Sequence, residues 1–208
     1  MRTGRDLLRH FVKGLFMAML AKSTFAKMFE AAELCRQRAL DVPMLVLIYT
    51  AMDTLAWALY ADKNQSVRER FVALCDNYII PSSDILCTGL ELYSARCSIL
   101  HTLGWESELS KAGKARSVFY SFGTDKPTLA QAVLELTNPG KFVSLRPDEL
   151  LVSLKTVVAK IATLASTDDE LAARLSEAAG KQYRSVESSA GDKIFAAYID
   201  KVQGNDPT

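Results

Sequence analysis

Arg96 and His101 are the residues best suited to chemistry in this sequence. They lie in the segment ELYSARCSILHT, residues 91–102, with four residues between them. Arginine is a fixed cation whose forked donors suit phosphate, and histidine can transfer a proton near pH 7. The two are sufficient for metal-independent RNA cleavage. The histidine would take a proton from a ribose 2′-OH or give one to the leaving group, while the arginine holds the phosphorane charge.

The spacing of Arg96 and His101 does not by itself bring their side chains together. Five positions on an ideal helix turn the two side chains about 140° apart. They converge if the long arginine swings round, if the helix unwinds before Gly104, or if a second subunit completes the site. A structural interpretation stays open, in which His101 interacts with the helix dipole and Arg96 neutralises a buried Asp53.

Two residues upstream can support this pair. Asp53 lies in a nearly unbroken apolar segment and needs a cationic or hydrogen-bonding partner. The candidates for that partner are Arg96, Arg68 and Arg70. Asp53 would either steer Arg96 or form a buried structural pair with it. Tyr93 precedes Arg96 by one turn and can stack on a base or pack in a helical core.

Downstream of His101 the sequence offers a hydroxyl and three cations. Ser107 can cap the segment that follows the histidine or contact a substrate, and both interpretations stay open. A basic group follows, which can track a phosphate backbone or form a solvated charged surface: Lys111, Lys114 and Arg116.

Composition and missing motifs exclude many functions. The chain of 208 residues has a net charge of +1, so contact with nucleic acid requires a local basic patch. It contains no phosphate-binding loop, dinucleotide-binding glycine turn, nucleophile elbow or zinc-binding HExxH helix. Two His, and four Cys without a Cys-x-x-Cys pair, argue against a zinc site, and we expect no metal and no cofactor. The same cysteines are typical of reduced thiols in a cytoplasmic protein.

Apolar residues recur at helical spacing through most of the chain. The first half predicts a basic amphipathic helix within residues 1–27 and further helices at about residues 24–40, 44–61, 67–78 and 83–103. Ser66 is expected to cap the helix at 67–78, and Gly104 ends the last one. The short links between these segments predict an antiparallel up-and-down helical bundle.

The second half adds a small β element to this mainly α fold. The segments SVFYSF (117–122) and KFVSL (141–145) have the β-branched and aromatic content of two short strands. A brief helix between them is expected to start with a capping box formed by Thr128 and Gln131. A longer amphipathic helix begins at Pro147, with an inner face that extends to Leu164, and a last apolar group lies near residues 194–202.

Length favours one domain over residues 1–208, with a bundle core at about 24–104 and a C-terminal elaboration at about 111–202. Residues 44–61 just reach the length of a membrane span. A charge at its centre would cost roughly 2.5–3.5 kcal/mol on insertion scales. Because Asp53 lies there, we expect the central helix of a soluble bundle rather than a membrane span.

The segment from about Val42 to Gly123 resembles the HEPN superfamily. The resemblance rests on Arg96-x4-His101 at the end of a helix that follows an apolar one, which is similar to the Arg, four-to-six residues, His signature of that family. It extends to a bacterial HEPN-like group through IYTAMDTLAW, SVRERF, LYSARCSILHT with Ser107 beyond, and SVFYSFG, with weaker similarity at FVSLRPDELL. The sequence departs from the family pattern after the signature arginine, where Asn, Asp or His is common and Cys97 stands here. Cys97 lies one turn before His101, so its thiol can still orient the imidazole.

The resemblance implies an all-helical up-and-down bundle that forms a homodimer, with Arg96 and His101 near the interface. Many family members are metal-independent ribonucleases of toxin–antitoxin, phage-defence or RNA-processing systems, and others only bind nucleotides, RNA or protein. We therefore consider three hypotheses: an endoribonuclease, a non-catalytic module that binds a nucleotide, RNA, an antitoxin or another protein, and a structural dimer in which Arg96 only neutralises Asp53.

Overall fold

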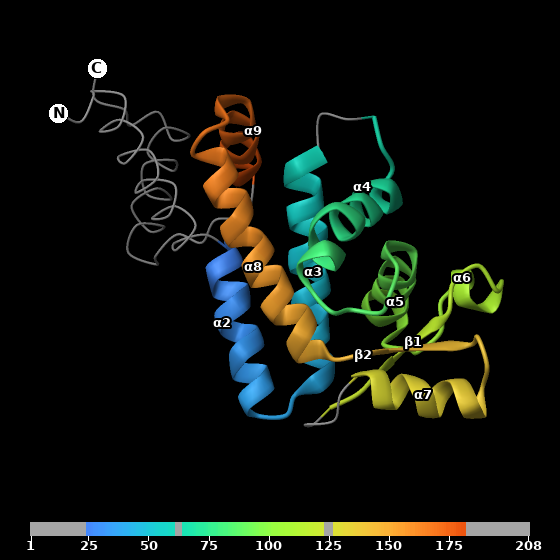
Figure 1. Ribbon diagram of the computed structural model, residues 1–208. Coiled ribbons are helices and arrows are strands. Elements are labelled where there is room, and N and C mark those ends of the chain that lie inside the picture. The colour runs from blue at the N-terminus through green and yellow to red at the C-terminus, as the bar shows by residue number, and fades with distance from the viewer. Residues whose placement is uncertain (1–23, 61–63, 123–126, 182–208) are drawn as a thin grey trace, which may run out of the picture.

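The computed structural model describes residues 24–60, 64–122 and 127–181 (Figure 1). These residues form a mainly helical protein with a small two-stranded sheet, which confirms the predicted fold class in outline. The long helices of the first half are α2 (Thr24–Gln37), α3 (Asp41–Tyr60), α4 (Val67–Leu74) and α5 (Gly89–Thr102). The second half contains α6 (Glu108–Lys111), β1 (Ser117–Tyr120), α7 (Pro127–Thr137), β2 (Phe142–Leu145), α8 (Pro147–Ala165) and α9 (Asp169–Gly180).

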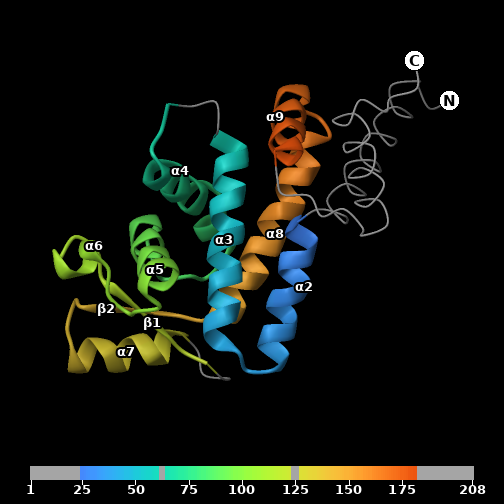
Figure 2. The same ribbon diagram turned by 180° about the vertical axis from the view of Figure 1, so that it is seen from behind.

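α3 is the central helix of the described residues. It packs against α2, α4, α5, α8 and α9, and the two opposite ribbon views both show it between α2 on one side and α4 and α5 on the other (Figures 1 and 2). A helix with partners on most sides must be apolar on most sides. α3 also has the length and hydropathy of a membrane span, and 56% of that apolar window is buried inside the protein.

α4 begins where the sequence predicts it. The side chain of Ser66 accepts a hydrogen bond from the backbone N–H of Glu69, and the Glu69 carboxylate accepts one from the backbone N–H of Ser66. This reciprocal capping box satisfies two backbone donors that the first turn leaves unpaired. Beyond α4 the chain continues as a π-helical turn over Cys75–Ile79 and a 3₁₀ turn over Ile80–Ser82.

α5, the helix that carries Arg96 and His101, starts later than predicted. The sequence places its start at residues 83–84, but the helix begins at Gly89 behind a capping box of Thr88 and Glu91. The N–H of Gly89 also donates to Oδ1 of Asp76 at 3.0 Å. A Cβ on Gly89 would lie 2.5 Å from that oxygen, so this approach requires glycine. The tertiary contact with Asp76, which sequence patterning does not reveal, fixes this end of α5.

The two strands pair in parallel, with Ser117 opposite Phe142 and Tyr120 opposite Leu145. Parallel strands need a crossover connection, and α7 supplies it. The predicted capping box of Thr128 and Gln131 is wrong. The Gln131 side chain instead accepts from the N–H of Ser144 and donates to the C=O of Phe142, so its amide covers backbone groups of β2 that face away from β1.

α8 joins the core of the first half. Leu150, Leu154 and Val157 are fully buried, and α8 packs against α2 and α3. The prediction that Leu164 lies on the inner face is wrong: Leu164 is 41% exposed, whereas Ile161 and Ala165 at the same end of α8 are buried. The predicted N-terminal helix and the apolar group near residues 194–202 lie outside the described residues.

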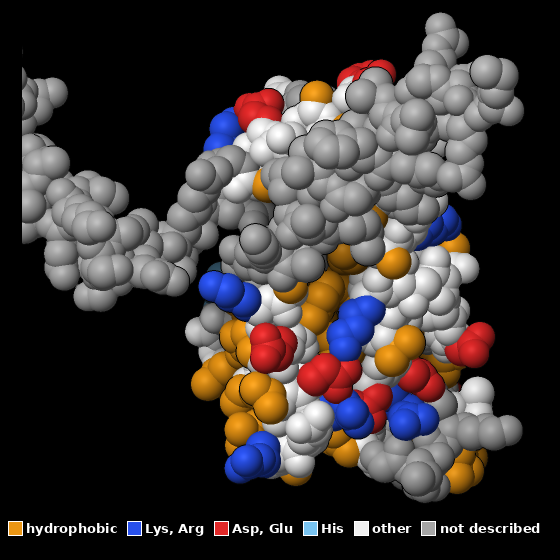
Figure 3. Space-filling view, turned by 90° about the vertical axis from the view of Figure 1, so that its left-hand side faces the viewer, with side chains coloured by type: hydrophobic (Ala, Val, Ile, Leu, Met, Phe, Trp, Pro, Cys, Tyr) orange, Lys and Arg blue, Asp and Glu red, His pale blue; other side chains and the backbone are white. Residues whose placement is uncertain are grey.

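The face made by α2 and α8 has mixed charge. Glu33 on α2 accepts from both Arg36 and Lys155, the second of which lies on α8. The space-filling view of this face shows acidic and basic side chains next to each other rather than a patch of one sign (Figure 3). A surface of this kind does not attract a polyanion.

Candidate functional site

Arg96 and His101 are in contact within one chain. Nη1 of Arg96 lies 3.2 Å from Nε2 of His101. α5 stays helical to Thr102, and Leu103 ends it in a left-handed conformation at φ 50°. Of the three routes by which the two side chains could meet, the structure uses the long arginine side chain. Neither unwinding of the helix nor a second subunit is needed.

This contact selects one tautomer of a neutral imidazole. A guanidinium has only donors, so in a hydrogen bond across this contact Nε2 of His101 is the acceptor. The neutral ring then has its proton on Nδ1. The side chain of His101 is exposed at the C-terminal end of α5. The ring nitrogen that faces Arg96 is therefore the one with a lone pair, as a general base requires.

Asp53 holds the other side of the same guanidinium. Nε of Arg96 donates to Oδ2 of Asp53 at 2.7 Å, and Nη2 forms an ion pair with the same oxygen at 2.6 Å. Burial acts against the charge of Arg96, but the hydrogen bond and negative charge of Asp53 outweigh it, so the pKa of Arg96 is raised. Of the three arginines considered from the sequence, Arg96 is thus the partner of Asp53. Oδ1 of Asp53 is buried and accepts no hydrogen bond from any described residue.

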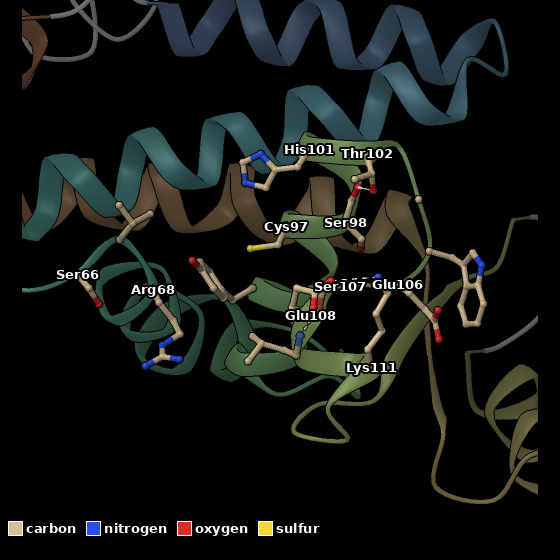
Figure 4. Close-up of a pocket in the computed structure, with 15 residues that line it drawn as sticks. Ser66, Arg68, Cys97, Ser98, His101, Thr102, Glu106, Ser107, Glu108 and Lys111 are labelled. Atoms are coloured by element: carbon tan, nitrogen blue, oxygen red, sulfur yellow. Dashed lines mark hydrogen bonds and ion pairs between the residues drawn. The ribbon is translucent and has the colours of Figure 1, made fainter.

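His101 opens onto a pocket of about 860 Å³ between α4, α5 and α6. Figure 4 shows Ser66 and Arg68 on the α4 side, Cys97 and His101 on α5, and Ser107, Glu108 and Lys111 at α6. This volume is within the range of small-ligand sites. Arg96 is not among the residues that line the pocket; its side chain is 14% exposed and contacts the lining residue His101.

Tyr93 and Cys97 form the wall next to Arg96. The ring of Tyr93 lies 5.9 Å from the Arg96 guanidinium carbon and packs edge-on against Phe71. Burial and a hydrogen bond with Cys97 raise the pKa of Tyr93. Sγ of Cys97 lies 3.9 Å from Nη1 of Arg96. The thiol therefore contacts the arginine and the tyrosine, and no contact with the imidazole of His101 is seen among the described residues.

Ser107 caps α6, which was one of its two predicted roles. Its side chain accepts from the N–H groups of Leu109 and Ser110, and its hydroxyl lies 2.6 Å from that of Ser94 on α5. Ser107 is 7% exposed and still forms part of the pocket wall. Its hydroxyl is thus engaged in joining α6 to α5.

The three predicted phosphate-binding cations separate in the structure. Lys111 lines the pocket and forms an exposed ion pair with Glu108 at 3.1 Å. Arg116 donates to both carboxylate oxygens of the buried Glu91, at 2.5 and 3.2 Å, and does not line the pocket. Lys114 is exposed and also lies outside the pocket lining.

Sequence reasoning missed two residues of this pocket. Arg68 was considered only as a partner for Asp53, yet it lines the pocket from α4. Trp105 also lines it, is 60% exposed, and lies 5.9 Å from the ring of Phe142 on β2. The only sequence feature that could have indicated Arg68 is its place in the SVRERF segment, close to the N-cap residue Ser66. A basic residue at the start of a helix can face the end of a neighbouring helix. Trp105 follows Gly104 and had no pattern to indicate its role.

No group of three or more His, Cys, Asp or Glu side chains that could hold a metal ion occurs in the described part of the chain. Comparison with protein-family models, with curated proteins and with solved structures finds no match to this chain.

Proposed function

We propose that this chain is an HEPN-like helical protein that cleaves RNA without a metal ion, with His101 as the proton-transfer residue and Arg96 as the phosphate-directed cation. One observation carries the proposal: Nη1 of Arg96 donates to Nε2 of His101 at the wall of an open pocket. The up-and-down bundle and the endoribonuclease activity of a toxin–antitoxin, phage-defence or RNA-processing system are part of the same proposal.

The geometry suggests how the pair would act. Asp53 anchors Arg96 through Nε and Nη2, which leaves Nη1 able to pass from His101 to a non-bridging phosphate oxygen. That exchange frees the lone pair on Nε2 of His101. Nε2 then takes the proton of the ribose 2′-OH, the 2′ oxygen bonds to phosphorus, and the bond from phosphorus to the 5′ oxygen breaks. The leaving oxygen takes up a proton from the imidazolium or from water, and the products are a 2′,3′-cyclic phosphate and a 5′-OH end.

The test uses labelled single-stranded RNA with the purified full chain, in the presence and absence of EDTA. We expect cleavage in both conditions, and His101→Ala should slow it by about 10²-fold or more. His10→Ala is the matched control, because it removes the other histidine of the chain. Loss of activity on addition of EDTA, or equal activity of the His101→Ala variant and the wild type, would contradict the proposal.

A second candidate function is a non-catalytic binding module. It is favoured by the same guanidinium, because Asp53, His101 and Cys97 already occupy most donors of Arg96. In this case the pocket would bind a nucleotide, RNA or a protein, such as an antitoxin. Calorimetry with mononucleotides tests this function: binding that Arg96→Ala abolishes, without RNA turnover in the wild type, supports it over the nuclease.

We further propose a homodimer that uses α7. Leu129, Val133 and Leu136 recur on one side of this helix and are 59%, 53% and 84% exposed. An exposed apolar stripe of this kind is typical of protein interfaces. α7 packs on β2, and Phe142 of β2 contacts the pocket residue Trp105. Light scattering should give a dimer mass for the wild type and a monomer mass for Val133→Glu.

The remaining expectations belong to the same proposal. We propose that the protein is cytoplasmic and that α3 is a core helix rather than a membrane span. The burial of more than half of its apolar window supports this assignment. Fractionation of cells that produce the full chain should place it in the soluble fraction.

A further inference from the structure

We propose that Arg68 forms a second phosphate subsite in the pocket and binds a phosphate that flanks the one at His101 in single-stranded RNA. The inference rests on the proposed function, because it takes RNA as the ligand. It adds a residue to which sequence reasoning gave no role toward a ligand, and it assigns that residue a contact distinct from the one at Arg96.

The first step is the distribution of charge in the pocket. Arg68 and Lys111 are the two Lys or Arg side chains that line it. Lys111 is paired with Glu108, and Glu106 also lines the pocket on that side. With one lysine against two glutamates the α6 side has a net negative charge, and it offers a phosphate no net attraction.

The second step is the state of Arg68. It is exposed, and it makes no hydrogen bond or ion pair with any residue that the structure describes. Among the described residues no hydrogen bond or ion pair holds its guanidinium, and Glu69 next to it acts on it only through its charge, whereas the guanidinium of Arg96 is held by Asp53 and His101. A free guanidinium can bind two oxygens of one phosphate through parallel N–H donors.

The third step is the position of Arg68 relative to His101. Figure 4 shows the two side chains at different parts of the pocket, Arg68 on α4 and His101 at the end of α5, with Cys97 between them. A single phosphate at His101 would not occupy both places. A strand that passes through the pocket would present successive phosphates to them, and stacking on an exposed aromatic ring is the usual companion of such contacts.

The experiment measures binding apart from cleavage. A single-stranded oligonucleotide with 2′-O-methyl groups lacks the 2′-OH nucleophile, so the full chain can bind it but cannot cut it. Its Kd is measured by fluorescence anisotropy at several salt concentrations for the wild type, Arg68→Ala and Arg70→Ala. Arg70 is the matched control, because it carries the same charge two residues further along α4 and does not line the pocket.

We expect Arg68→Ala to weaken binding about tenfold, as for the loss of a charged hydrogen bond. The slope of log K against log salt should fall by about 0.7, the value for one single-strand phosphate contact. Arg70→Ala should leave both quantities close to those of the wild type. Equal effects of the two variants, or no binding by the wild type, would overturn the proposal for Arg68.

The outcome for Arg68 is distinguishable from the outcome for the nuclease. Binding that depends on Arg68, together with no cleavage of unmodified RNA, supports the subsite and overturns the nuclease. Cleavage that depends on His101, together with equal binding by the Arg68 and Arg70 variants, overturns the subsite and leaves the nuclease standing. Equal Tm values of the two variants show that neither result reflects unfolding.

Discussion

Arg96 donates to His101 within one helix, over 3.2 Å, while Asp53 on α3 holds the opposite edge of the same guanidinium. The three side chains form a chain of contacts from the central helix to the pocket wall. Asp53 holds Arg96 in place, Arg96 donates to Nε2 of His101, and the imidazole of His101 is exposed to solvent. Sequence reasoning left Asp53 between steering Arg96 and forming a structural pair with it, and the structure shows the contact on which both interpretations rest.

The first prediction concerns the Asp53–Arg96 pair. Arg96→Ala leaves the largely buried carboxylate of Asp53 without its counter-charge and should lower the free energy of unfolding by about 3 kcal/mol. Asp53→Asn in the same background should recover part of that loss, because it removes the uncompensated charge. Urea unfolding of the two single variants and the double variant measures the coupling between them.

Additive losses in this double-mutant cycle would show that the pair does not interact in solution. Arg70→Ala serves as the control for loss of a positive charge, because no hydrogen bond or ion pair of the Arg70 side chain is seen among the described residues. Its effect on stability should stay within about 0.5 kcal/mol.

The second prediction concerns pH and the Glu91–Arg116 pair, which supports the start of α5. Burial favours protonated Glu91, but hydrogen bonds from Arg116 and the Thr88 backbone outweigh it, so the pKa of Glu91 is lowered from 4.5. A lowered pKa in the folded state adds stability that is complete above about pH 4.5. That stability is lost as the pH falls through the folded-state value.

Arg116→Ala should therefore cost about 3 kcal/mol at pH 7 and clearly less near pH 3, because without Arg116 the pKa of Glu91 rises and the carboxyl group can take up a proton instead of needing a counter-charge. Chemical denaturation at the two pH values gives the comparison, with the exposed neighbour Lys114→Ala as control. The same loss at both pH values would mean that the charge of Glu91 is not what Arg116 stabilises.

The third prediction concerns a buried hydrogen bond between α3 and β1. The hydroxyls of Tyr49 and Tyr120 lie 2.8 Å apart, and Tyr49 is fully buried. Tyr49→Phe should lower stability by about 1–2 kcal/mol, because it leaves the Tyr120 hydroxyl without its partner. Tyr49→Phe with Tyr120→Phe should cost less than the sum of the single changes. A double variant that loses the full sum would indicate that the two hydroxyls do not stabilise each other.

The fourth prediction uses the cysteines as probes. Cys75 and Cys87 are buried, and burial raises the pKa of both thiols, so little thiolate is present at neutral pH. Cys35 and Cys97 are half-buried and should react first with a thiol reagent in the native protein, which mass spectrometry of the labelled peptides can identify. The 2′-O-methyl oligonucleotide should slow labelling of Cys97, which lines the pocket, and leave Cys35 unchanged. Equal protection of both would argue that the oligonucleotide does not bind in the pocket.

Helical periodicity and local helix caps could be predicted from the sequence. The apolar pattern predicted α2, α3 and α8, and Ser66 predicted the start of α4, because these features depend on residues within a few positions of one another. The presence of two short strands followed from local composition in the same way. The pairing of Arg96 with His101 as candidates needed only their chemical types.

Tertiary structure decided what contacts distant in sequence control. Asp76 set the start of α5 at Gly89, and Gln131 bonded to β2 instead of capping its own helix. The direction of the strands also depended on the path of the chain between them. A local pattern carries no information about a partner many residues away, so these features could not be predicted from it.

The same division holds for the candidate site. The sequence by itself determined that Arg96 and His101 were the residues with the right chemistry, and that Asp53 needed a partner. Only the packing of α5 against α3 decided that Arg96 is this partner, and only the positions of α4 and α6 placed Arg68 at the pocket and Arg116 away from it. Side-chain chemistry is fixed by residue type, but the charge that a ligand meets depends on which neighbours neutralise it.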